Sequence, residues 1–423
     1  MSKSSGTRKQ PMVKVIGKHD SAEAYTIRDF LQRCDVPFEW VGLTSEEEAR
    51  ALVGVETLDD QNLPICIFPD GTRLKNPDIR KITEKLGWFR MPSRTEYDLA
   101  IYGAGPAGLS AAVYGSTEGL KTILIERYAI GGQAGSSSRI ENYLGFPEGI
   151  SGADLADRAR EQATRFGTEI LLAREGVRAV FGTGKLEGIL DDGTRINARA
   201  TICSTGVAYR SLNLPNEAKY FGAGLYYGAG ASEAPLTKHE HVFVVGGGNS
   251  AGQATMHFAS YASKVMLVVR GDSLKSTLSQ YLVDRIYAAK NVEVLTQTEV
   301  TALHGEASLE AITITNCRTG DSQIVKTHWL FACIGGEPHT AWAEEVGLVR
   351  DEGGYLVTGP DLLRNGQRPA NWAPARDPYY LETNMPGMFA AGDVRHNSIK
   401  RCASAVGEGA MAVAFVHRFL SDG

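Results

Sequence analysis

Three glycines with the spacing of a phosphate-binding turn stand about a quarter of the way along the chain. Gly103, Gly105 and Gly108 follow a short apolar run, and a second apolar run at 122–125 ends in Glu126. In such a turn the first glycine allows a tight bend, the second lets the backbone approach a pyrophosphate, and the third lets helix and strand pack closely. Free N–H groups at the helix start favour phosphate, and a terminal acid accepts hydrogen bonds from ribose hydroxyls. The pattern therefore predicts a dinucleotide site.

A second turn of the same kind follows the apolar run 242–245. It comprises Gly246, Gly248, Asn249, Ser250 and Ala251, with Ala251 at the third small position. The next apolar run ends in Arg270, with Lys275 shortly after it. A cation at this place favours a 2′-phosphate, whereas an acid would bind a free 2′-hydroxyl. The second site is therefore predicted to bind NADPH in preference to NADH, although a solvated surface arginine would give the same pattern.

The elements that must position these turns are short apolar strands and small-residue helices. We expect strands at 99–102, 122–125, 242–245 and 265–269, and helices at 109–117 and from 249 to 261. Strands of this kind, buried on both faces and alternating with helices, are typical of a parallel sheet. The fold class is predicted to be α/β, with two Rossmann-like nucleotide-binding domains.

Size and charge place broad limits on the function. The chain has 423 residues, 43% hydrophobic and 22% charged, with a formal net charge of -5. These values suit two or three soluble domains and give no sign of attraction to nucleic acid or to a membrane. We expect residues 1–11 to be a disordered leader, because they are polar and lack an apolar signal core, and the protein to be cytoplasmic.

The cysteines are scattered. No two of the six lie closer than sixteen positions, so neither a Cys-x-x-Cys pair nor metal-ligand spacing occurs. We expect six reduced thiols, mostly buried, and no bound metal.

Residues 12–90 have the pattern of a separate α/β unit. Strands and helices are expected in the order βαβα and then ββα, which resembles the thioredoxin/glutaredoxin fold. Leu63-Pro64 falls where that fold has its cis-proline, but the position of its redox pair reads Lys18 to Ala22 and contains no cysteine. The resemblance implies either a docking or regulatory module or a packing domain, because a fold alone does not define a function.

Several later stretches resemble the low-molecular-weight thioredoxin reductases. They are Gly131-Gly-Gln133, Glu141-Asn-Tyr-Leu-Gly-Phe-Pro147, the strand 200–206, the run Thr383 to Asp393, and Lys400-Arg-Cys-Ala403. The resemblance covers about residues 97–423. It implies FAD, NAD(P)H and a homodimer, with a linker at 91–97, an FAD domain at 98–214 and 327–423, and an NAD(P)H domain at 215–326. The two domains would rotate about a hinge near Leu214 and Lys326, and the extra stretch 363–381 is expected to be a surface loop.

The resemblance also implies a set of flavin contacts. They fall at Gly103, Gly105, Pro106, Ala107, Gly108, Glu126, Arg127, Gly132, Gln133, Asn142, Val177, Thr205, Gly206, Gly392, Asp393, Arg401, Cys402 and Ala403. A helix at 406–419 would direct the positive end of its dipole at the flavin ring.

One departure removes the chemistry that defines those reductases. Their redox Cys-x-x-Cys would fall at 228–231 or 229–232, where this chain has no cysteine, and Glu233 follows. Cys402 and Glu233 are weak catalytic candidates, and Cys402 is more simply a small residue in a tight turn. We expect an FAD-dependent NADPH oxidoreductase that uses an unknown external electron acceptor. The alternatives are a flavin-bound sensor acting through its N-terminal domain and a thioredoxin reductase that uses unidentified thiols.

Overall fold

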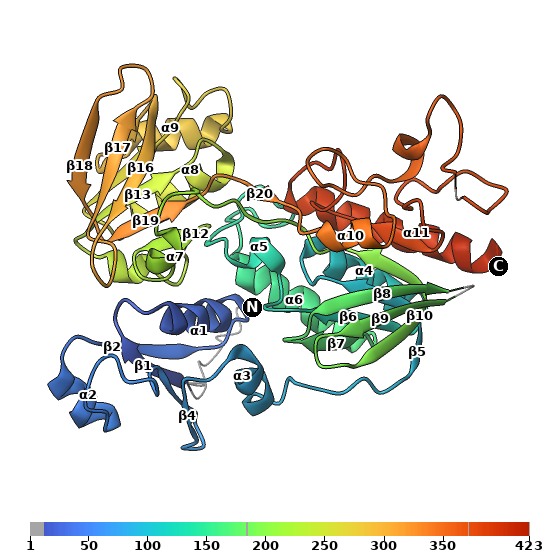
Figure 1. Ribbon diagram of the computed structural model, residues 1–423, viewed down its shortest axis with the longest axis horizontal. Helices are drawn as coiled ribbons and strands as arrows, with labels where there is room; N and C mark the ends of the chain where they lie inside the picture. The colour runs from blue at the N-terminus through green and yellow to red at the C-terminus, as the bar shows by residue number, and fades with distance from the viewer. Residues whose placement is uncertain (1–11, 183–184, 371, 423) are drawn as a thin grey trace, which may run out of the picture.

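Five β-sheets organise the residues that the computed structural model describes, 12–182, 185–370 and 372–422 (Figure 1). The predicted leader 1–11 lies outside them. We name three parts of the chain by their sheets. The N-terminal unit contains β1 to α3, the β5 unit is built on the seven-stranded sheet, and the β13 unit is built on the five-stranded sheet with a three-stranded hairpin sheet.

The N-terminal unit has the element order that the sequence predicts. Its elements are β1 (Val13–Lys18), α1 (Ala22–Arg33), β2 (Phe38–Leu43), α2 (Glu46–Val53), β3 (Ile65–Ile67), β4 (Arg73–Lys75) and α3 (Ile79–Lys85). The strands are ordered β2-β1-β3-β4, with β1 parallel to β2 and antiparallel to β3. Side chains cap all three helices, since Ser21, Ser45 and Asp78 each accept an N–H of the first turn. The Leu63–Pro64 peptide is cis.

The β5 unit carries the first glycine turn. Its sheet contains β5 (Glu96–Tyr102), β6 (Thr122–Glu126), β7 (Glu169–Leu172), β8 (Gly176–Gly182), β9 (Lys185–Leu190), β10 (Arg195–Cys203) and β21 (Met388–Ala390). The strand order is β7-β6-β5-β10-β9-β8, with β21 beside β10. Strand β5 begins inside the predicted linker 91–97.

Helices α4 (Pro106–Thr117), α5 (Gly132–Gly135), α6 (Gly152–Arg165), α10 (Ala341–Glu345) and α11 (Cys402–Asp422) complete the β5 unit. Helix α4 starts earlier than predicted because Pro106 is well suited to the first helical position. Helix α11 starts at Cys402, before the predicted 406. The two helices touch at Gly409, where a Cβ would overlap the Ala107 carbonyl oxygen, so this close packing requires glycine.

The β13 unit carries the second glycine turn. Its parallel sheet has the order β12-β19-β13-β14-β15, built from β12 (Leu225–Tyr227), β19 (Trp329–Ala332), β13 (His241–Val245), β14 (Lys264–Val268) and β15 (Val292–Leu295). Helices α7 (Glu217–Tyr220), α8 (Asn249–Phe258) and α9 (Gln280–Ala288) belong to it, with the hairpin strands β16 (Thr298–His304), β17 (Ala311–Asn316) and β18 (Ser322–Lys326). Helix α8 ends before the predicted 261.

The chain passes between these two units at a place that differs from the predicted hinge. Strands β11 (Ala208–Tyr209) and β20 (Gly336–Glu337) pair antiparallel and form a separate two-stranded sheet. Strand β19 still belongs to the β13 unit, because it pairs with β12 and β13. The predicted boundary at 326/327 thus falls between β18 and β19 of the β13 unit, whereas the chain passes between the two units at β11 and β20. The hinge near Leu214 and Lys326 stays a prediction.

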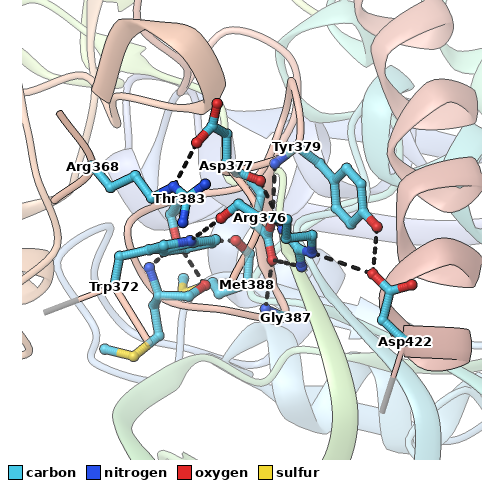
Figure 2. A network of polar contacts seen from close by, with 11 residues as sticks. Arg368, Trp372, Arg376, Asp377, Tyr379, Thr383, Gly387, Met388 and Asp422 are labelled. Atoms are coloured by element: carbon cyan, nitrogen blue, oxygen red, sulfur yellow. Dashed lines mark hydrogen bonds and ion pairs between the residues drawn. The ribbon is translucent and has the colours of Figure 1, made fainter. Parts of the chain in front are cut away.

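The stretch 363–381 contains no helix or strand among its described residues, as expected of a loop. Figure 2 shows how it is fixed to the β5 unit. Arg376 donates to both oxygens of the fully buried Glu382, at 2.6 and 3.1 Å, and its Nε lies 3.3 Å from Asp422 at the end of α11. The loop is therefore anchored at its C-terminal end. None of the described helices is both long and apolar enough to cross a membrane.

Candidate functional site

In the first glycine turn, Gly103 and Gly108 are tightly packed against the backbone, whereas Gly105 has free space beside it. A Cβ on Gly103 would overlap the Ser204 carbonyl, and a Cβ on Gly108 would overlap the Gly103 carbonyl oxygen. At Gly105 a Cβ would meet a single atom within 4 Å, the Cα of Gly132 at 4.0 Å. No side chain caps α4, so its first N–H groups remain available. This is the geometry that a pyrophosphate requires.

Glu126 lies next to this turn at the end of β6. One carboxylate oxygen accepts the Ala104 N–H at 2.7 Å, and the other accepts the Tyr128 N–H at 2.8 Å. Burial raises the pKa of Glu126, and the two amide bonds oppose this change. The carboxylate is thus held in one orientation, and each oxygen retains acceptor capacity for a ribose hydroxyl.

The neighbouring predicted contacts are less enclosed. Arg127 is exposed and lies 3.4 Å from Glu175, and Val177 is exposed on β8. Asn142 and Thr205 are also exposed. Their exposure leaves these four side chains without a fixed position in the site.

The segment after Tyr128 closes over the first turn. A Cβ on Gly132 would contact the Cα of Gly105, and the Gln133 amide donates to the Val207 carbonyl at 2.6 Å. The Gly132 carbonyl in turn accepts a hydrogen bond from Arg33 of α1. Sequence reasoning missed Arg33, because nothing local to α1 indicates a contact with a loop about a hundred residues away.

The second predicted flavin segment reaches the same place from the far end of the chain. A Cβ on Gly392 would touch the Ala107 Cβ, so the turn after β21 lies against the start of α4. Burial raises the pKa of the half-buried Asp393, and within the described residues nothing donates a hydrogen bond to its carboxylate. An oriented acceptor without a partner fits a polyhydroxy chain such as that of a flavin cofactor.

Helix α11 begins close to Asp393. Arg401 and Ala403 are exposed at its start, and Cys402 is half-buried. Burial raises the pKa of the Cys402 thiol to about 11, and the Asp393 carboxylate adds to this rise. The thiol is protonated at neutral pH, which does not favour a nucleophilic role. The contacts around both segments together fit FAD, with phosphates over α4 and the ring end near α11.

The second glycine turn has the same division into a closed and an open side. A Cβ on Gly246 would overlap the Cys333 carbonyl, whereas a Cβ on Gly248 would meet nothing within 4 Å. The Asn249 amide holds the following loop, because it donates to the Ser279 hydroxyl at 3.0 Å and accepts the Ser279 N–H at 2.7 Å. Ala251 is buried and Ser250 is exposed at the start of α8. Arg270 and Lys275 are both exposed in the loop after β14.

Glu233, the other catalytic candidate, is fully buried and turned toward the N-terminal unit. Its Oε2 lies 3.1 Å from Nη2 of Arg28 on α1. His19, at the position where the thioredoxin fold has its redox pair, packs against Trp329 with ring centroids 6.5 Å apart. The structure thus places the two segments that lack the expected cysteines at one interface.

The glycine turns, Glu126 and the segment around Asp393 define a two-nucleotide oxidoreductase. In agreement, the family model "Pyridine nucleotide-disulphide oxidoreductase" matches residues 97–409, so the chain belongs to that family of flavin- and NAD(P)H-dependent enzymes. Within it, the chain groups with the low-molecular-weight thioredoxin reductases. The match begins at residue 97, so the N-terminal unit lies outside it.

Individual relatives support this grouping. The thioredoxin reductase of Bacillus subtilis is 32% identical over 327 residues, which are 77% of this chain and 95% of that protein. The "34.2 kDa protein in rubredoxin operon" of Clostridium pasteurianum is 31% identical over 78% of this chain and 99% of its own length. Among solved structures, Lactococcus lactis thioredoxin reductase in its FR conformation gives a TM-score of 0.69 at 26% identity, covering 77% of this chain and all of that one. The thioredoxin reductase of T. acidophilum gives 0.68 at 27% identity, covering 77% and 99%.

Proposed function

We propose that this chain is an FAD-dependent NADPH oxidoreductase that passes electrons to an acceptor outside the chain without an internal disulfide. The observation that carries the proposal is the segment 228–232, which contains no cysteine and leads into a Glu233 paired with Arg28. A dithiol relay requires two thiols close together and at least one accessible thiolate. Burial raises the pKa of both the Cys203 and the Cys333 thiols, which argues against a relay built from these cysteines.

The chain's own residues then bind and orient the two nucleotides. Glu126 would hold the ribose of FAD, and the first turn of α4 would hold its phosphates. Asp393 would accept from the ribityl hydroxyls, while the start of α11 favours negative charge at the ring end. The flavin, when bound, supplies the hydride-accepting chemistry.

The preference for NADPH rests on charge. Arg270 and Lys275 are exposed at the end of β14, where a 2′-phosphate would lie, and the Asn249–Ser279 bonds hold the loop that carries them. Guanidinium and ammonium groups both bind phosphate, whereas NADH has an uncharged hydroxyl at the 2′ position. We expect Arg270→Glu to lower the preference for NADPH without affecting flavin binding.

The proposal includes the finer architecture. Residues 12–90 would be a thioredoxin/glutaredoxin-like domain without redox cysteines, which the sheet order β2-β1-β3-β4 and the cis Leu63–Pro64 peptide support. The β5 unit would be the FAD domain and the β13 unit the NADPH domain. A cytoplasmic homodimer follows from the family resemblance, and light scattering on the purified protein tests the dimer.

Anaerobic titration of the purified, flavin-loaded protein with NADPH tests the central claim. Loss of the flavin absorbance with one equivalent of NADPH, and a much weaker response to NADH, would support the reductase. Flavin that binds but is not bleached would instead indicate the sensor alternative. Alkylation of the accessible cysteines tests the third alternative. A thioredoxin reductase with unidentified thiols would lose its activity toward disulfides after alkylation, whereas the proposed reductase would still be bleached by NADPH.

A further inference from the structure

Helix α1 of the N-terminal unit lies against both of the other units. Toward the β13 unit it presents Tyr25 and Arg28, and toward the β5 unit it presents Asp29 and Arg33. In Figure 1 the N-terminal unit lies along one side of the molecule, with α1 on the side that faces the other two units. A single helix of 12 residues therefore joins parts of the chain that are otherwise connected through β11 and β20.

The contact with the β13 unit is buried and aromatic. The Tyr25 ring meets Tyr226 edge-on at 5.0 Å between centroids and Phe221 at 5.8 Å. Tyr25 is 7% exposed and belongs to the same core cluster as Tyr226. A Cβ on Gly222 would overlap the Cα of Ala22, so the helix start packs directly on backbone. The Tyr25 side chain of α1 is thus part of the core of the β13 unit.

An ion pair lies behind this aromatic contact. The side chains of Arg28 and Glu233 are 1% and 0% exposed, with 3.1 Å between Nη2 and Oε2. The Arg28 guanidinium also stacks 4.3 Å above the Trp40 ring. Within the described residues its Nη1 is buried without a hydrogen-bond partner. Removing either charge would leave the other buried and uncompensated, so the two units are held together by a pair that is strong only when complete.

The contact with the β5 unit is polar around Asp29 and Arg33 and aromatic at Phe30, whose ring meets the Tyr128 ring at 5.8 Å between centroids. The Tyr128 hydroxyl donates to the Thr26 carbonyl at 2.8 Å and lies 3.1 Å from the Asp29 carboxylate. The Arg33 guanidinium lies 3.3 Å from the same carboxylate and donates to the Gly132 carbonyl. This side of α1 therefore holds the loop that covers the first glycine turn.

Direct contacts between the β5 and β13 units are weaker. Arg285 of α9 lies 2.8 Å from Glu141, but these side chains are 47% and 25% exposed. Solvent screens such a pair, so it fixes orientation poorly. The connecting strands β11 and β20 pair over two residues each. A partly buried link also runs through Tyr209 of β11, whose hydroxyl lies 3.0 Å from that of Ser136 and whose ring stacks on Tyr227. The fully buried ion pair, by contrast, is made by α1.

We propose that α1 is a latch that holds the β13 unit in one orientation against the β5 unit, with Arg28 as its positioning residue. Opening the latch requires the Arg28–Glu233 pair to separate. The N-terminal unit would thus hold the other two units in place, a role beyond the proposed redox function. This role concerns only the orientation of the β13 unit, so it does not depend on the identity of the electron acceptor.

Spin-label distance measurements on the full chain test the latch. One label is placed on Cys317, which is exposed in the β17–β18 turn, and the other on Thr117→Cys at the exposed end of α4. Burial raises the pKa of the half-buried Cys34 and Cys402 thiols to about 12 and about 11, so both react slowly at neutral pH. No nucleotide or acceptor is needed, so failure of the latch and failure of the proposed function are distinguishable.

The expected result is one narrow distance in the parent and in Arg28→Lys, which keeps the charge. A second, shifted distance is expected in Glu233→Gln and in Arg28→Met, because each leaves the other charge buried and uncompensated. The double variant Arg28→Met with Glu233→Met removes both charges while keeping bulk and should return to one narrow distance. The control is Lys14→Met, which breaks the exposed Lys14–Glu39 pair of the same unit and should leave the distance unchanged. A single narrow distance in both folded single variants would overturn the proposal.

Discussion

The carboxylate of Glu408 on α11 accepts the backbone N–H of Gly392 at 2.7 Å, and the same oxygen lies 3.2 Å from Nε of Arg395. Arg395 is 5% exposed. Helix α11 thereby holds the turn that presents Asp393, the proposed ribityl acceptor. Sequence reasoning overlooked both residues, because a glutamate in the second turn of a helix is ordinary on its own.

Replacing Glu408 by alanine should both destabilise the protein and weaken flavin binding. Arg395 would remain buried without its partner, which costs about 3–5 kcal/mol, and the Gly392 turn would lose its anchor. Urea unfolding of the flavin-free protein and fluorescence titration with FAD measure the two effects. Glu408→Gln should retain more FAD affinity, since the amide oxygen still accepts the Gly392 N–H. The control is the exposed Glu352→Ala; equal FAD affinity in all three variants would contradict the assignment.

Alanine at Gly105 should separate a cofactor role from a structural one. A Cβ at position 105 would meet no protein atom closer than 4.0 Å. The free energy of unfolding of the flavin-free variant should therefore stay within about 0.5 kcal/mol of that of the parent. FAD affinity should fall about tenfold, or roughly 1.4 kcal/mol, because the Cβ would occupy the path of the pyrophosphate. In Gly108→Ala, by contrast, the Cβ overlaps the Gly103 carbonyl, and the fold itself should be lost. Unchanged FAD affinity in Gly105→Ala would show that the turn does not bind phosphate.

The matching change at Gly248 should affect the second nucleotide alone. A Cβ there meets no protein atom within 4 Å, so both the fold and the flavin spectrum should be unchanged. The Kd for a non-reducing analogue of NADPH, measured by titrating the oxidised protein, should rise about tenfold. A variant with weakened flavin binding but normal NADPH binding would mean that the two turns are assigned to the wrong nucleotides.

Arg376→Met should destabilise the chain far more than Arg368→Met. Arg376 neutralises Glu382, which is fully buried, whereas Arg368 pairs with Asp377 at side-chain exposures of 43% and 59% (Figure 2). We expect a loss of about 3–5 kcal/mol for the first change and about 0–1 kcal/mol for the second, measured by urea unfolding. Equal effects would show that the loop 363–381 is not anchored through Glu382.

Alkylation should depend steeply on pH at Cys402 and leave flavin reduction intact. Because burial raises the pKa of its thiol to about 11, the reactive thiolate is scarce below that pH and becomes abundant as the pH approaches it. At pH 7.5 the exposed Cys317 should be modified first, as peptide mass spectrometry would show. Rapid modification of Cys402 at neutral pH, with loss of bleaching by NADPH, would restore it as a catalytic candidate.

Much of the structure of the N-terminal unit and of the two glycine turns could be predicted from residues that are close together in the sequence. The glycine spacing of 103–108, the acid at the end of β6 and the N-cap serines depend on neighbours within a few residues, and the predicted elements are found there. The sheet to which β19 belongs could not be predicted, because a short strand is assigned to a sheet by its partners, which lie far away in the sequence. Helices α4 and α11 also begin earlier than predicted, at Pro106 and Cys402.

The sequence by itself determined that two glycine-rich turns exist, that the strands after them lead into opposite charges, and that no closely spaced cysteine pair is present, because these are properties of residue type and spacing. The tertiary structure alone decided that Asp393 reaches the first turn, that Arg33 contacts Gly132, and that Arg28 meets Glu233. Each of these pairs spans about a hundred residues or more. Their strength comes from burial and desolvation, which exist only once the three units are packed together.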